Sequence, residues 1–60
     1  MYQSYNATNN SYGVMWRDFK EACEAIRYFS KAFNSKHCVV DRNTGEVLRI
    51  YECGVETYRA

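Results

Sequence analysis

The sequence predicts a small α+β domain in which one amphipathic helix packs on an antiparallel β-hairpin. Two patterns support this fold class: apolar residues recur with helical spacing over residues 18–33, and two β-branched segments flank a Gly-containing turn at residues 43–45. The chain has 60 residues, so residues 1–60 are expected to form a single domain. A domain of this size buries only about 60% of the surface that its unfolded chain exposes. We therefore expect marginal stability and a benefit from a partner surface.

The helix is expected over residues 18–33. Asp18 followed three residues later by Glu21 is a pattern similar to a capping box, in which side chains bind the free N–H groups of the first turn. Asn34 and Ser35 supply a C-terminal stop. At about 100° per residue, one helix face is apolar and should form the core. The residues on that face are Phe19, Ala22, Cys23, Ile26, Phe29 and Phe33.

Two strands are expected at residues 37–41 and 46–52, joined by a tight turn. A three-residue loop with Gly45 in the left-handed bulge position places Arg42 opposite Glu46, which is a favourable charge pair. A four-residue loop would shift the pairing by one residue and separate polar from apolar side chains less well. In the three-residue register, the face expected to pack on the helix carries Cys38, Val40, Leu48 and Ile50.

The segments outside the helix and the hairpin have weaker patterns. Residues 12–16 are apolar and β-prone, which predicts a short strand that leads into the helix and pairs beside the hairpin, giving a three-stranded βαββ sheet. Residues 1–11 are polar and uncharged, and we expect them to form a tail or an edge segment. Residues 53–60 are expected to form a C-terminal tail.

Composition and charge argue against several classes of protein. Eight Lys and Arg against seven Asp and Glu give a net charge of +1, so no overall field directs the chain to nucleic acid or to a membrane. No segment approaches the roughly 20 apolar residues of a membrane span, and residues 1–11 lack the features of a signal peptide. Three cysteines without paired spacing argue against a secreted disulfide framework. We expect a cytoplasmic protein with reduced thiols and no membrane partner.

No combination of residues predicts catalysis, a metal or a cofactor. His37 is the single histidine, and its neighbour Cys38 should point to the opposite face of the strand, so the two cannot act together as base and nucleophile. Three cysteines and His37 could in number supply zinc ligands, but the short knuckle spacings of structural zinc sites are absent. Packed thiols are the simpler interpretation of Cys23, Cys38 and Cys53. We therefore expect no enzyme activity.

A basic helix face predicts one alternative function, the binding of nucleic acid as an accessory or regulatory protein. Four cations lie opposite the core with a tyrosine at the margin, a combination that suits phosphate contact and base stacking. Glu21 and Glu24 interrupt this stripe and make ordinary i,i+4 pairs with it, which favours a solvated face. The candidate nucleic-acid-binding residues are Arg17, Lys20, Arg27, Tyr28 and Lys31.

Protein binding is the preferred prediction. The second hairpin face combines aromatic, cationic and apolar side chains, the mixture found at interface hot spots, and no segment is assigned to cover it. An exposed hairpin can also recruit a partner strand or pair with itself, which keeps a homodimeric structural module as a third possibility. A self-sufficient monomer with this face covered internally is the plain alternative. The candidate protein-binding residues are Tyr51, Arg49, Val47, His37 and Val39.

The segment DRNTGEV at residues 41–47, continuing into LRIY at residues 48–51, resembles the Asp-x-x-Thr-Gly-Glu hairpins of very short phage and mobile-element proteins. Small proteins of that type include anti-CRISPR and other counter-defence inhibitors. They typically occlude a functional surface of a host protein and have no catalytic residues of their own. The resemblance implies a phage-encoded, non-enzymatic inhibitor that binds a larger host protein or protein complex in the host cytoplasm, and it transfers no site residue.

Overall fold

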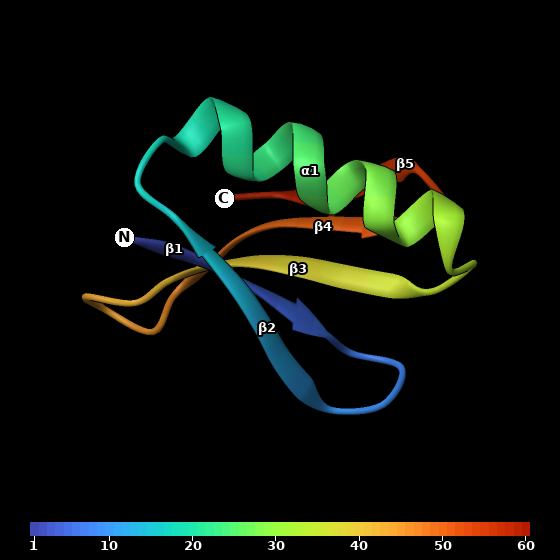
Figure 1. The fold of residues 1–60 in the computed structure, drawn as a ribbon, viewed down its shortest axis with the longest axis horizontal. Helices are drawn as coiled ribbons and strands as arrows, with labels where there is room; N and C mark the ends of the chain where they lie inside the picture. The colour runs from blue at the N-terminus through green and yellow to red at the C-terminus, as the bar shows by residue number, and fades with distance from the viewer.

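The computed structural model describes residues 1–60, which form one helix packed on a five-stranded antiparallel sheet. The strand order is β2-β1-β3-β4-β5, so β2 and β5 are the two edge strands. In Figure 1, α1 runs along one side of the sheet and no element lies on the other side. The elements in chain order are β1 (Tyr2–Asn6), β2 (Ser11–Trp16), α1 (Phe19–Ala32), β3 (Lys36–Asp41), β4 (Val47–Glu52) and β5 (Val55–Arg59).

The helix α1 forms where the sequence predicts it. Asp18 is the N-cap, and its carboxylate accepts a hydrogen bond from the backbone N–H of Glu21 at 2.9 Å, which confirms the capping signal. Asn34 follows the C-cap with a positive φ of 50°, the left-handed conformation that ends many helices. The core face is confirmed at Ala22 and Ile26, which are fully buried, but Phe33 is 70% exposed because it lies at the C-cap, past the last full turn.

The prediction for the N-terminal segment is wrong. Residues 1–11 do not form a tail or an edge, because they contain β1, an interior strand between β2 and β3. The pairing with β3 is regular from Tyr2 opposite Asp41 to Asn6 opposite His37. The strand predicted at residues 12–16 is confirmed as β2, but it pairs with β1 and not with the hairpin. The segment was missed because its polar, uncharged side chains show no apolar period, whereas its backbone is bonded on both sides.

The prediction for the C-terminal segment is also wrong. Residues 53–60 do not form a tail, because they contain β5, which pairs with β4 as the second edge of the sheet. The turn between these strands is Cys53-Gly54, with φ of 52° and 86°, so both residues lie in the left-handed region that tight two-residue hairpin turns require. A Cβ atom at Gly54 would also lie 3.0 Å from Cβ of Lys31. The expected three-stranded sheet therefore has five strands.

The hairpin of β3 and β4 confirms the predicted register only away from the turn. Lys36 pairs with Glu52, and the matching continues in step to Val39 opposite Arg49, which is the register of the three-residue loop. A bulge near the turn then brings Val40 opposite Val47 and leaves Leu48 as the extra residue. At the turn itself, the N–H of Asp41 donates to the backbone oxygen of Glu46 at 2.9 Å, so the loop has the four residues 42–45. The predicted three-residue loop with Arg42 opposite Glu46 is therefore wrong, and the bulge at Leu48 takes up the difference between the two registers.

The assignment of the two hairpin faces is reversed. Val39 and Tyr51 belong to the core cluster with Ala22 and Ile26 of α1. The ring of His37 lies 6.3 Å from the ring of Phe29, also in α1. The face predicted to lie outside is therefore the one under the helix. The side that carries Cys38, Val40 and Ile50 has no helix over it.

The relative widths of the helix and the sheet explain this reversal. A helix is about 10 Å across, whereas five strands spaced about 4.8 Å apart form a much wider layer. Long side chains with polar ends fill the flanks, because they bury their stems under the helix and keep their tips at its margin. Arg49 has this shape, whereas Tyr51 is 6% exposed beneath the helix, and the helix carries fully buried Ala22 and Ser30 on the side toward the sheet.

Candidate protein-binding surface

The side of the sheet away from α1 carries a row of side chains that crosses all five strands. Strand pairing sets this row, because residues directly opposite one another in antiparallel strands share a face. No member of the row is charged, and its ends, Tyr12 and Tyr58, are 56% and 46% exposed. The row consists, from β2 to β5, of Tyr12, Tyr5, Cys38, Ile50 and Tyr58.

A second row lies beside the first on the same side. It is also uncharged, and its central residue, Val40, is only 4% exposed because its neighbours surround it. The second row consists of Met15, Gln3, Val40 and Val47. We call these two rows together the open face. Charged residues appear only beyond the rows, as the pair of Lys36 opposite Glu52 and as Arg42.

The tyrosines at the β2 end of the open face are held in place. The rings of Tyr5 and Tyr12 have centroids 4.9 Å apart. The Tyr5 hydroxyl donates a hydrogen bond to Oδ1 of Asn10 at 2.6 Å, and the guanidinium of Arg42 lies 5.3 Å from the centre of the Tyr12 ring. A surface whose rings are already oriented loses less conformational entropy when it binds.

A bulge in β2 places Tyr12 and Met15 on the same side although they are three residues apart. Gln3 pairs with Met15 and Tyr5 pairs with Tyr12, so Gly13 and Val14 together lie opposite Ser4 alone. A Cβ atom at position 13 would lie 2.5 Å from Oγ of Ser4, so a larger residue in this bulge would force that hydroxyl to move. The bulge therefore keeps both rows of the open face continuous as far as the edge strand.

Four of the five predicted protein-binding residues do not lie on the open face. Val39 is fully buried, and His37 and Tyr51 are each 6% exposed beneath α1. Arg49 also faces the helix, with its guanidinium carbon 5.0 Å from the centre of the Phe19 ring. Only Val47 lies on the open face, because the hairpin bulge sets it opposite Val40.

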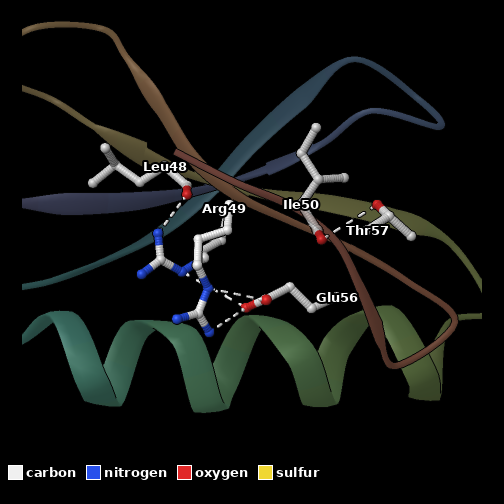
Figure 2. A network of polar contacts seen from close by, with 6 residues as sticks. Leu48, Arg49, Ile50, Glu56 and Thr57 are labelled. Atoms are coloured by element: carbon white, nitrogen blue, oxygen red, sulfur yellow. Dashed lines mark hydrogen bonds and ion pairs between the residues drawn. The ribbon is translucent and has the colours of Figure 1, made fainter.

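Arg49 belongs to a small ionic network between the sheet and the helix. Figure 2 shows its side chain directed toward α1, whereas Ile50 points to the opposite side. Nη1 of Arg49 donates to the backbone oxygen of Leu48 at 2.7 Å, and Nε lies 3.7 Å from Oε1 of Glu56. Arg59 donates two hydrogen bonds of 3.1 Å to Glu56 and so lowers the pKa of that carboxyl group. This network supports the fold and does not form a free binding site.

Two further polar groups on the helix side, those of His37 and Tyr51, are also engaged within the fold. Nδ1 of His37 lies 2.9 Å from Oγ of Ser35, and burial lowers the pKa of the imidazole. Burial, followed by the neighbouring Cys23 thiol, raises the pKa of Tyr51 to about 12. These groups are neutral at neutral pH, as buried groups without an ionic partner generally are.

The three cysteines lie in three separate places. Cys23 lies beside the core cluster, Cys38 lies in the open-face row, and Cys53 is exposed in the turn between β4 and β5. Burial raises the pKa of the Cys38 thiol. The Cys53 thiol donates to Oδ1 of Asn34 at 3.0 Å. No group of three or more His, Cys, Asp or Glu side chains is arranged to hold a metal ion.

The predicted nucleic-acid-binding residues are brought together only in part. Arg27, Tyr28 and Lys31 line one open cleft of about 530 Å³, together with Glu24 and the turn between β4 and β5. Nε of Arg27 donates to the backbone oxygen of Gly54 at 2.9 Å, so part of this guanidinium is engaged within the fold. Arg17 and Lys20 do not line the cleft.

Two tyrosines of the open face could not be placed from the sequence pattern. Tyr5 lies in the segment predicted as a tail or an edge, and Tyr58 lies in the predicted C-terminal tail, so neither residue has a predicted strand partner. The Cys-Gly pair at 53–54 was the available signal for β5, since a two-residue turn ending in Gly often joins hairpin strands.

The one helix, α1, is too short and too polar to span a membrane. Comparison with protein families, curated proteins and solved structures finds no match to this chain.

Proposed function

We propose that the protein is a non-enzymatic interaction module that binds a larger protein through its open face. The uncharged row that crosses all five strands, from Tyr12 to Tyr58, carries this proposal. The exposed apolar side chains of this face are Tyr12, Met15 and Tyr58, whereas Cys38 and Val40 at its centre are 5% and 4% exposed. Exposed apolar side chains gathered on one face are typical of interaction sites. Interfaces are enriched in tyrosine and depleted of charged residues at their centres, and the two rows of the open face contain three tyrosines and no charged residue.

The chemistry of the open face restricts the partner. Its centre is aliphatic and thiol-bearing, its ends are tyrosine, and its charges stand only at the border, at Arg42, Lys36 and Glu52. The partner should therefore offer an apolar patch with few charges at its centre and charges of both signs at its rim. By covering such a patch the protein would block it, which is the mode of inhibition that the resemblance to small phage proteins implies.

A matched pair of tyrosine variants tests this proposal. Tyr58→Ala removes an exposed ring from the open face, and Tyr28→Ala removes an exposed ring from the helix. A partner recovered from a host lysate and identified by mass spectrometry would be purified, and its affinity for each variant measured by calorimetry. We expect Tyr58→Ala to weaken binding by about tenfold or more and Tyr28→Ala to leave it unchanged.

The opposite result would remove the open face as the binding surface. If Tyr28→Ala weakened binding and Tyr58→Ala did not, the partner would contact the helix side. Thermal unfolding of both variants is the control. Because both tyrosine side chains are exposed, each variant should unfold at nearly the same temperature as the wild type.

Binding of nucleic acid is a second candidate, supported by the cleft that gathers Arg27, Tyr28 and Lys31. Fluorescence anisotropy with a labelled single-stranded oligonucleotide, at low and at high salt, tests it. Phosphate contacts produce an affinity that falls steeply with salt, and Lys31→Gln should reduce that slope. An oligonucleotide that fails to bind at low salt excludes this candidate and leaves the open-face proposal unaffected.

A further inference from the structure

The two edges of the sheet differ in their protection. An edge strand presents unpaired backbone N–H and C=O groups that another strand can bind, and natural proteins usually guard such edges with charged side chains. β2 has no charged residue, and residues 1–16 contain none at all. Three of the six residues of β2 are large hydrophobic residues with exposed side chains: Tyr12 at 56%, Val14 at 56% and Met15 at 50%.

The opposite edge, β5, is guarded. Two of its five residues are charged, Glu56 and Arg59, and they bind each other through two hydrogen bonds of 3.1 Å. Glu56 also pairs with Arg49 of the adjacent strand. A strand added to β5 would have to accommodate these charges, whereas a strand added to β2 meets none.

The bulge at Gly13 and Val14 determines which strand can pair with β2. Bulges discourage edge pairing with an ordinary strand, because the extra residue puts the two strands out of step and turns side chains to the wrong face. A second copy of β2 has the same bulge. If the two bulges lie opposite each other, the strands remain in step along their whole length.

We propose that the protein forms a two-fold homodimer in which β2 pairs antiparallel with β2 of a second copy. The axis passes between Gly13 and Val14. Tyr12 then lies opposite Met15 of the second copy, and both belong to the open face. Gly13 lies opposite Val14, and Ser11 opposite Trp16, on the helix side. All six residues of β2 match in face, which a strand without the bulge could not achieve in this register.

Pairing of this kind joins the two sheets into one continuous sheet with both helices on the same side. The row that ends at Tyr12 continues into Met15 of the second copy and from there across its sheet. No like charges meet at the axis, since neither strand has any. The inference goes beyond the proposed function, because it concerns the edge of the sheet and does not depend on what binds the open face.

Charge substitutions at the two open-face positions of β2, Tyr12 and Met15, test both the β2–β2 interface and its register. Analytical ultracentrifugation of the wild-type protein from about 1 μM to about 1 mM should show a monomer–dimer equilibrium. The double variant Tyr12→Lys with Met15→Lys places like charges opposite each other twice, and we expect its dissociation constant to rise by about tenfold or more. The double variant Tyr12→Glu with Met15→Lys places opposite charges there, and we expect it to dimerise.

Two controls make each outcome decisive. Val55→Lys adds a charge to the other edge at a residue of similar exposure, 64%, and should not change the dissociation constant. Circular dichroism confirms that each variant is folded. A wild-type protein that stays monomeric up to about 1 mM, or a dimer that is unaffected by Tyr12→Lys with Met15→Lys, overturns the proposal. A folded Tyr12→Glu, Met15→Lys variant that is monomeric while the wild type dimerises overturns the register.

Discussion

The two faces of this sheet are built from different kinds of side chain. The face under α1 uses long residues with polar ends, such as Tyr51 and Arg49, whose tips are bound by other polar or aromatic groups. The open face uses compact, uncharged residues at its centre, Cys38 and Ile50, and tyrosines at its ends. The more aliphatic face is the uncovered one.

This difference shows that hydrophobic character alone does not identify the core in a small domain. One helix is too narrow to cover five strands, so the covered face needs residues that reach sideways and can tolerate water at their tips. The uncovered face has no such requirement. Its apolar side chains are therefore available to a partner, which is why we propose this face as the binding surface.

The largest expected effect on stability comes from comparing two neighbouring residues of β4. Tyr51→Ala removes a buried ring from beneath α1 and should lower the free energy of unfolding by about 3 kcal/mol, because a cavity remains. Ile50→Ala, on the open face, should cost about 1 kcal/mol, because water can fill the space and less area is buried. Urea unfolding measures both variants, and equal costs would contradict the difference between the faces.

A smaller effect is expected where the helix is tied to the turn between β4 and β5. Oγ of Ser30 donates to the backbone oxygen of Arg27 at 2.8 Å and accepts from the buried N–H of Gly54 at 2.9 Å. Ser30→Ala leaves that N–H without a partner and should lower the free energy of unfolding by about 1 to 2 kcal/mol. Exposed Ser11 is the matched control, since Ser11→Ala should have little effect on urea unfolding.

The third prediction concerns pH and the helix side. Burial lowers the pKa of His37 below 6.5, so the unfolded chain takes up a proton at a pH where the folded protein does not. Stability should therefore fall as pH decreases from about 7.5 to about 5.5. His37→Gln should show a weaker dependence over this range in thermal unfolding, and a variant as pH-sensitive as the wild type would assign the effect to another group.

The smallest effect is expected at Glu56, on the guarded edge. Its pKa is lowered chiefly by the hydrogen bonds from Arg59, so its stabilising contribution is present above the ordinary carboxyl range and is lost as pH falls through its lowered pKa. Because exposed ion pairs are screened, Glu56→Gln should lower the melting temperature slightly at low salt and not at high salt. A difference that persists at high salt would show that the carboxylate does more than balance charge.

Local patterns predicted the helix, its caps and the hairpin pairing away from the turn, because each depends on residues close together in sequence. The choice of hairpin face was not predictable in this way. Arg49 and His37 argue against burial, yet the groups that accommodate them, Glu56 and Ser35, lie in the predicted C-terminal tail and just after the predicted helix. The partner groups were invisible until those segments had a place in the fold.

The candidate site shows the same limit. An uncovered, partly apolar hairpin face was expected, and one exists, but it is the opposite face from the one predicted. Val47 remains on it only because a bulge changes the alternation, and bulges leave little trace in sequence. Tyr5 and Tyr58 were missed with the strands that carry them.

The interior position of β1 has a consequence for how the chain folds. β1 comes before the other strands in the chain, but one of its two partners is β3, which ends at Asp41. Closing this seam requires contacts between residues far apart in sequence, which are slow to form. Until they form, the ribbon of β1 and β2 has two open edges and no charge to keep it apart from other chains. Refolding yield should therefore fall as protein concentration rises, and a renaturation series at increasing concentration would measure it.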